Sequence, residues 1–157
     1  MIRKVERKYL EIKSIENLKI SKPPNMGCVV KLVDPPDFQL NKFFYKQVGK
    51  KYQWVDRLVW ENKDWINYTS NNNLKTYVLK KKDDLVGYFE LIFNSKKNEC
   101  EIAYFGILED YFNKGFGGYM LSEALKNSFK LGAKRAWVHT CSLDHPHAIQ
   151  NYKSRGM

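Results

Sequence analysis

The stretch Asn113-Lys114-Gly115-Phe116-Gly117-Gly118 is the part of the chain whose composition most directly suggests binding chemistry. It stands between a predicted strand, which ends at Ile107, and a predicted helix. The first N–H groups of a helix lack intrahelical partners, and glycines let a ligand approach them closely. The segment therefore predicts a phosphate or pyrophosphate site, although a tight packing turn would also account for the glycines. It is neither a Walker loop nor a G-x-G-x-x-G fingerprint.

Potential metal ligands gather near the C-terminus, at His139, Cys141, Asp144, His145 and His147. Their spacing fits no zinc pattern. His139 and Cys141 also alternate along a predicted strand, so no metal site is expected here.

From Lys75 onward the hydrophobic pattern predicts the elements β-β-β-α-β-α, with the first three strands forming an antiparallel meander. A glycine, Gly132, is expected to end the first helix, and Asp144 to cap the second. The expected elements are strands over Thr76–Lys80, Leu85–Phe93 and Cys100–Ile107, a helix carrying Leu121, Ala124, Leu125 and Phe129, a strand over Arg135–Cys141, and a helix from Pro146 toward Ser154.

The first half of the chain is less regular. A strand is predicted over Cys28–Val33, because the following Asp34-Pro35-Pro36 removes ladder donors and favours a turn. A helix is expected from Phe38 to about Val48. The segments Trp54–Trp60 and Lys63–Tyr68 suggest a second helical stretch.

The 157 residues, 43% of them hydrophobic, are enough for one domain over residues 1–157. The three cysteines lack CxxC spacing and are expected to be reduced thiols. The N-terminus does not resemble a secretory signal, and the longest apolar run is too short for a membrane helix. We therefore expect a soluble, cytoplasmic protein with no membrane partner.

The formal net charge of +10 favours polyanionic ligands. Nucleic acid, an acidic membrane face and a phosphorylated cofactor all satisfy it, and so does a merely lysine-rich solvated surface. Since the aromatic and basic residues form no RNA-recognition motif, no nucleic-acid partner is expected.

Over Lys75 to Met157 the sequence resembles the GNAT superfamily of N-acetyltransferases, in an uncharacterised bacterial subgroup. The family's Q/R-x-x-G-x-G/A motif after a strand end is matched by Phe105-Gly106-Ile107 and then Phe112 to Gly117. The closing motif N-x-x-A-x-x-x-Y-x-x-x-G-F is matched by the run from His145 to Met157. Phe112, His145 and Met157 depart from the family's residue types.

The resemblance implies an α/β fold with a GNAT-like mixed, mostly antiparallel sheet, splayed where the cofactor enters, and with helices on both faces. It implies an acyltransferase that passes acetyl from acetyl-coenzyme A (acetyl-CoA) directly to an amine in a ternary complex. The residues that the resemblance assigns to the cofactor are Phe105, Gly106, Ile107, Asn113, Lys114, Gly115, Phe116, Gly117, Gly118, His145 and Ala148.

Catalytic roles also follow from the resemblance. Glu101 takes the position of the base that deprotonates the amine, and Tyr152 that of the acid that protonates the leaving thiolate. A backbone N–H near Phe105–Ile107, at the family's strand bulge, would stabilise the oxyanion. From the residues alone, Glu101 can equally be a solvated strand residue and Tyr152 a packing aromatic.

The acceptor amine is expected near Glu90, Trp54 and Arg57. Glu90 interrupts an apolar strand, so it either binds a cationic acceptor or occupies the strand's outward phase. If a turn pairs Asn94 with Glu99, Glu90 lies on the same face as Glu101. Tryptophans at the spacing seen here also occur in cores.

The alternative function is a non-catalytic module that binds or senses an acyl-CoA, and a nucleic-acid-binding basic domain comes after it. The acceptor, the acyl-chain preference and the oligomeric state stay open, a homodimer included. The resemblance also implies a further strand after Met157 that helps wall the acceptor site. We therefore expect the chain to be cut short there or to receive that strand from a partner.

Overall fold

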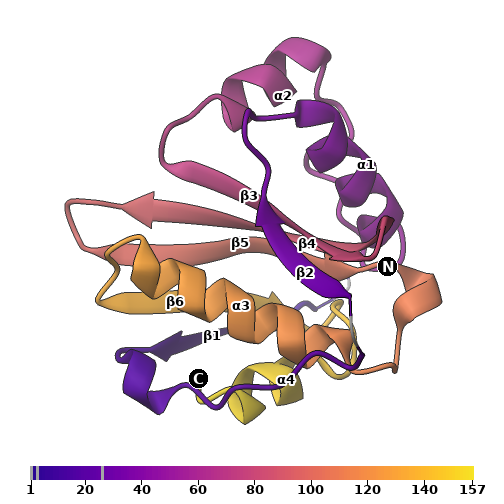
Figure 1. Ribbon diagram of the computed structural model, residues 1–157. Helices are drawn as coiled ribbons and strands as arrows, with labels where there is room; N and C mark the ends of the chain where they lie inside the picture. The colour runs from indigo at the N-terminus through magenta and orange to yellow at the C-terminus, as the bar shows by residue number, and fades with distance from the viewer. Residues whose placement is uncertain (1, 3, 26) are drawn as a thin grey trace.

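The structure, a computed structural model, describes residues 2, 4–25 and 27–157. It contains one six-stranded sheet in the order β1-β6-β5-β4-β3-β2, with helices on both faces (Figure 1). The strands are β1 (Arg7–Ile12), β2 (Cys28–Leu32), β3 (Leu74–Lys81), β4 (Asp84–Asn94), β5 (Glu99–Ile107) and β6 (Arg135–Cys141). The helices are α1 (Phe38–Gly49), α2 (Asn62–Thr69), α3 (Phe116–Lys130) and α4 (Ala148–Ser154), with 3₁₀ turns at Ile15–Asn17 and Glu109–Tyr111.

Neighbouring strands pair antiparallel except β5 and β6, which are parallel. The helix α3 makes the crossover between these two strands, as parallel pairing requires. The predicted meander β3-β4-β5 and the mixed, mostly antiparallel sheet with helices on both faces are therefore confirmed.

Alternating residues of the central strands feed two separate cores. Leu79 and Phe89 pack on the side of α3, in a cluster that includes Leu121 and Leu125. Their neighbours Val78 and Tyr88 face the other way and pack against α1. Figure 1 shows α1 and α2 on one side of the sheet and α3 on the other, with α4 beside α3. The period-2 alternation of the strands thus explains how one sheet supports both helical layers.

Two parts of the first half differ from the sequence-based expectation. The strand β1 has no counterpart in the prediction, because its polar sequence RKYLEI is that of an exposed edge strand beside β6. Residues 54–60 are turns instead of helix. There the backbone N–H of Arg57 donates to the Tyr45 hydroxyl at 3.0 Å, so a tertiary contact takes the place of a helical bond.

Among the described residues, no helix is long and apolar enough to span a bilayer.

Candidate active site

The parallel strands β5 and β6 separate in the middle of the sheet. They are paired only from Glu99 to Glu101. Immediately beyond, the β4–β5 register shifts: Leu91 pairs with Ile102 and Glu90 with Tyr104, which leaves Ala103 as an extra, bulged residue. A bulge bends its strand, so β5 turns away from β6 at this point. The expected splay is present, and its bulge lies at Ala103, upstream of the predicted Phe105–Ile107.

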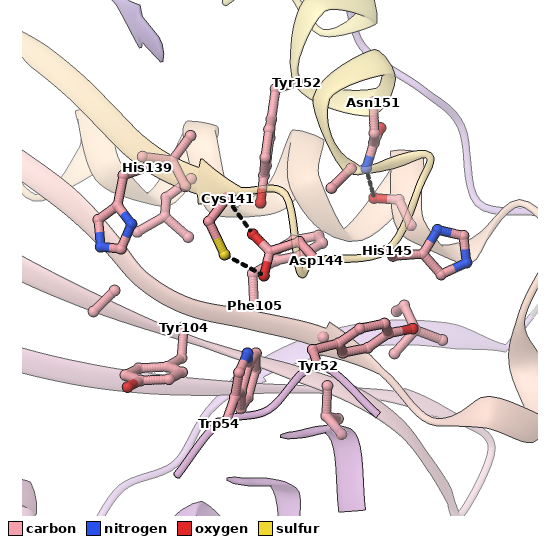
Figure 2. Close-up of a pocket in the computed structure, with 18 of the residues that line it drawn as sticks. Tyr52, Trp54, Tyr104, Phe105, His139, Cys141, Asp144, His145, Asn151 and Tyr152 are labelled. Carbon is pink, nitrogen blue, oxygen red and sulfur yellow. Dashed lines mark hydrogen bonds between the residues drawn. The ribbon is translucent and has the colours of Figure 1, made fainter. Parts of the chain in front are cut away.

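A cavity of about 740 Å³ lies at this splay. Its volume is in the range of pockets that hold cofactor-sized ligands. Figure 2 shows side chains from β5, β6 and the segments that follow α1 and β6 converging on it. Val5 and Arg7, from the N-terminal segment, also line its wall.

One end of the cavity is formed by residues 113–118, which we call the glycine loop. Gly115 is the N-cap of α3 and has φ +86°, a left-handed conformation that glycine adopts without strain. The Asn151 side chain donates to the Gly117 carbonyl at 3.1 Å and ties this turn to α4 (Figure 2). The start of α3 is thus fixed with its free N–H groups beside the cavity.

The structure places ten of the eleven predicted cofactor residues in the cavity wall, namely Phe105, Gly106, Ile107, Asn113, Gly115, Phe116, Gly117, Gly118, His145 and Ala148. The exception is Lys114. Its side chain is exposed, is not part of the wall, and donates to the Asp110 carbonyl at 3.0 Å. The side chain of Lys114 therefore caps the preceding turn, and its contact with the cofactor stays a prediction.

His145 lies at the mouth of this end, between two aromatic rings. Its ring centroid is 5.2 Å from that of Phe112 and 6.2 Å from that of Tyr52. Burial lowers the His145 pKa, and the neighbouring His147 and Lys51 lower it further. The imidazole is therefore biased toward its neutral form.

Tyr152 projects from α4 into the middle of the cavity. Its side chain is 7% exposed, and its ring packs edge-to-face on Phe105. The hydroxyl points toward the Asp144 carboxylate (Figure 2). Burial raises the Tyr152 pKa, and the negative charge of Asp144 adds to the shift. The phenol is therefore protonated at neutral pH.

Asp144 does not cap the last helix as predicted. Its carboxylate accepts hydrogen bonds from the Thr140 hydroxyl at 2.6 Å and from the Cys141 N–H at 2.9 Å, which fixes the turn after β6. The helix α4 begins only at Ala148, and its N-cap, His147, forms no side-chain cap. Sequence reasoning missed Asp144 as a cavity residue because an aspartate before a helix ordinarily indicates a cap.

Glu101 lies near the start of β5, at the end of the cavity away from the glycine loop. It is half-buried and lines the wall near His139. Burial raises the Glu101 pKa, and His139 acts in the opposite direction. Asn94 pairs with Glu99 and Ile92 with Glu101, so the expectation that Glu90 shares a face with Glu101 is confirmed.

Glu90 itself does not reach the cavity. Its side chain is 0% exposed and accepts hydrogen bonds from Asn41 at 2.8 Å and from the Tyr68 hydroxyl at 2.5 Å. It also forms an ion pair with Arg57 at 3.3 Å. The expectation that Glu90 contacts the acceptor is therefore wrong, because all of its surroundings are protein. Trp54 and Arg57, the other two predicted acceptor residues, do line the cavity.

No group of three or more His, Cys, Asp or Glu side chains in the described part of the chain could hold a metal ion.

Comparison with known proteins places these features in a family. Residues 37–157 match the family model described as "Acetyltransferase (GNAT) family". No curated protein matches the chain.

Three solved structures share the fold. A GCN5-related N-acetyltransferase from Kribbella flavida has a TM-score of 0.66 at 16% identity, with 94% of this chain and 52% of that chain covered. The ribosomal-protein-S18-alanine N-acetyltransferase from Escherichia coli has a TM-score of 0.63 at 14% identity, with coverage of 82% and 76%. An aminoglycoside acetyltransferase from an uncultured soil sample, in complex with sisomicin, has a TM-score of 0.70 at 12% identity, with coverage of 83% and 88%. The present chain thus spans about half the length of the Kribbella protein.

Proposed function

Because the chain belongs to the GNAT family of acetyltransferases, we propose that it is an N-acetyltransferase that transfers acetyl from acetyl-CoA to an amine. The observation that carries this proposal is the continuity of the cavity. One space runs from the glycine loop at the start of α3, past Tyr152, to Glu101 on β5. Anion-binding groups, an acid and a base thus line one path, in the order that acetyl transfer needs.

The glycine loop fits the pyrophosphate of acetyl-CoA. The start of α3 offers free backbone N–H groups and the positive end of the helix dipole. A Cβ added at Gly117 would first meet the Asn151 side-chain nitrogen, at 3.5 Å, so the backbone on this side is only loosely covered by protein. Ala148 and Tyr152, four residues apart on α4, both line the cavity, and the small Ala148 leaves room for the pantetheine arm.

Two side chains move protons in the proposed reaction. Glu101, directly or through a water, takes the proton of the acceptor ammonium, because only the neutral amine has the lone pair that attacks the thioester carbon. Backbone N–H groups of β5 beyond the bulge stabilise the negative charge that develops on the carbonyl oxygen. The C–S bond then breaks, and Tyr152 gives its hydroxyl proton to the departing thiolate. Because the transfer is direct, no acyl-enzyme is proposed, and none of the three free thiols has an assigned catalytic role.

We place the reaction in the cytoplasm, since Cys28, Cys100 and Cys141 are free thiols and such thiols persist in a reducing compartment.

The test has two stages. Acetyl-CoA should raise the unfolding temperature, with about 2.7 kcal/mol of stabilisation at 100 times its dissociation constant. Release of free coenzyme A thiol is then measured with a panel of amines, including amino acids, polyamines, an aminoglycoside and a peptide N-terminus. Stabilisation without amine-dependent thiol release would show a binding or sensing module instead. If acetyl-CoA gave no stabilisation and no amine gave thiol release, the proposal would be overturned.

A further inference from the structure

Arg57 occupies a box of aromatic rings at the end of the cavity where the acceptor is proposed to bind. The residue is only 7% exposed. Its guanidinium carbon lies 4.1 Å from the ring centroids of Tyr68 and Tyr104, 4.8 Å from that of Trp60, and 5.6 Å from those of Tyr45 and Trp65. These rings come from α1, α2, β5 and the turn between the helices, so the guanidinium is held in one orientation. Such contacts suit the flat face of a guanidinium.

A single ion pair anchors this guanidinium. Its Nη1 lies 3.3 and 3.5 Å from the two carboxylate oxygens of Glu90, which has no exposed surface. Burial by itself lowers the Arg57 pKa, but the charge of Glu90 and the neighbouring Tyr68 and Tyr104 raise it above its ordinary value. Arg57 is therefore a fixed cation.

The other guanidinium nitrogens are available to a ligand. Arginine has five N–H donors. The geometric hydrogen bonds of the Arg57 side chain in the described part of the chain come from Nη1 and go to Glu90. Neither Nε nor Nη2 belongs to the fully buried, unpaired polar atoms found in that part of the chain. Arg57 lines the cavity, so Nε and Nη2 are the donors left for an acceptor that enters this end of it.

The free donors favour one chemical group on the acceptor. A rigid guanidinium fork between apolar rings matches a planar carboxylate, and low polarity around it strengthens the bond. Glu90 already balances one positive charge, so a monoanion fits better than a phosphate dianion. The amine end of the acceptor is matched by Glu101, and Asp56 adds a second carboxylate to the wall.

Building on the proposed function, we propose that the acceptor is an amine that also carries a carboxylate, an amino acid or a short peptide. Its carboxylate binds the free edge of Arg57, and its amine faces Glu101. Arg57 is then the residue that determines specificity, and Glu90, together with Asn41 and Tyr68, positions it.

Matched pairs of acceptors test this inference in the unaltered protein. Phenylalanine is compared with phenethylamine, lysine with cadaverine, and glutamate with γ-aminobutyrate, because the members of each pair differ by one α-carboxylate. kcat/KM should be higher for the amino acid by about 10-fold or more in at least one pair, as expected for a charge-assisted hydrogen bond. The difference should lie mainly in KM, since the carboxylate is bound equally before and during the reaction.

Variants then assign the preference to Arg57. Arg57→Met alone would leave Glu90 buried and unpaired, so the double variant Arg57→Met with Glu90→Gln is used. In it the amino acid to amine ratio should fall to about one, and Arg57→Lys should keep part of the preference because it keeps the charge. Lys63→Met is the control, since it removes an exposed cation of α2 that does not line the cavity.

Each outcome is decisive. A wild-type ratio of one or less in all three pairs, with thiol release from amines lacking a carboxylate, would overturn this inference and leave the acetyltransferase standing. A preference that persists in the double variant would also overturn it. No thiol release with any acceptor would overturn the proposed function, and the inference with it.

Discussion

At the scale of single residues, Tyr152 and Glu101 face one cavity from different elements, and burial raises the pKa of both. The same shift has opposite consequences for their roles. A phenol with a raised pKa stays protonated at neutral pH, but it is a weaker proton donor. A carboxylate with a raised pKa is a stronger base once ionised but needs a higher pH to ionise. The raised pKa of Glu101 therefore limits the reaction at low pH, whereas Tyr152 keeps its proton at neutral pH.

Replacing Tyr152 with Phe deletes only the hydroxyl and keeps the ring against Phe105. Turnover should fall by about 10²-fold or more, as is typical for loss of a general acid, with acetyl-CoA affinity little altered. Steady-state rates and calorimetric binding measure the two quantities. Tyr119→Phe, on α3 and outside the cavity wall, is the control. Normal turnover with only a modest loss of stability would make Tyr152 a packing aromatic.

Replacing Glu101 with Gln should abolish the acidic limb of the rate profile. In the wild type, kcat/KM should fall as the pH drops through the raised pKa of Glu101, above the usual range for glutamate. Glu99→Gln, on the same strand but outside the wall, should keep that limb. Wild-type rates in Glu101→Gln across the whole limb would place the base elsewhere.

Glu101→Gln should also raise the unfolding temperature, and this gain should be largest at neutral and higher pH. Because the folded-state pKa of Glu101 is raised, its ionised form destabilises the fold. At neutral pH, Glu101→Gln should therefore unfold at a higher temperature than the wild type. The gap should narrow as the pH falls from the raised pKa of Glu101 to the ordinary glutamate pKa, below which the folded and unfolded states of the wild type are both protonated. Calorimetric scans at several pH values check this.

At the scale of elements, two glycines set the local geometry because they have no Cβ. Gly117 lies in the first turn of α3, and Gly106 lies where β5 contacts α1. At Gly117 the absence leaves the helix N-terminus open to the cavity. At Gly106 it lets β5 approach α1, since a Cβ there would lie 2.3 Å from a Val48 methyl carbon. One glycine therefore supports binding, and the other supports packing.

Gly117→Asp should weaken acetyl-CoA binding by about 10-fold or more, because a carboxylate would repel the pyrophosphate. The fold should tolerate it, since the first added atom makes an ordinary contact at 3.5 Å and a helix N-terminus favours Asp. Asn127→Asp, which adds a negative charge at the far end of α3, is the control. Unchanged affinity in a calorimetric titration would show that the phosphates bind elsewhere.

Gly106→Ala should destabilise the fold by about 1–3 kcal/mol, the usual range for overpacking a core. Trimming its neighbour in Val48→Ala should relieve the clash, so the double variant should be more stable than the sum of the single changes implies. Chemical denaturation of all four proteins measures this coupling. Purely additive changes would mean that β5 and α1 adjust independently.

At the scale of the whole molecule, the sequence predicted the parts that depend on local patterns. The meander, α3 and the glycine loop follow from periodicity and from glycines within a few neighbouring positions. The candidate roles of Glu101 and Tyr152 came from the family resemblance, and the structure places both side chains in the cavity wall.

The buried network around Arg57 could not be predicted in this way. It joins Asn41 on α1, Tyr68 on α2 and Glu90 on β4, residues that have no local relation in the sequence. The face of Glu90 followed from strand register, but the partners on that face depend on how the helices pack. Only the tertiary structure shows that Glu90, a predicted acceptor residue, instead pairs with Arg57.

The pairing of β1 with β6 has a consequence for how the chain acquires its fold. The Glu6 N–H donates a hydrogen bond to the Ser142 hydroxyl, 136 positions away in the sequence. The first strand to be synthesised, β1, can therefore pair only after β6, the last strand, has been made. Contacts of such long range close late, and an edge strand that joins late detaches first. In hydrogen exchange under native conditions, we expect β1 amides to lose protection before those of β3 to β5. Uniform protection across the sheet would show instead that the N-terminal strand and the meander unfold as one cooperative unit.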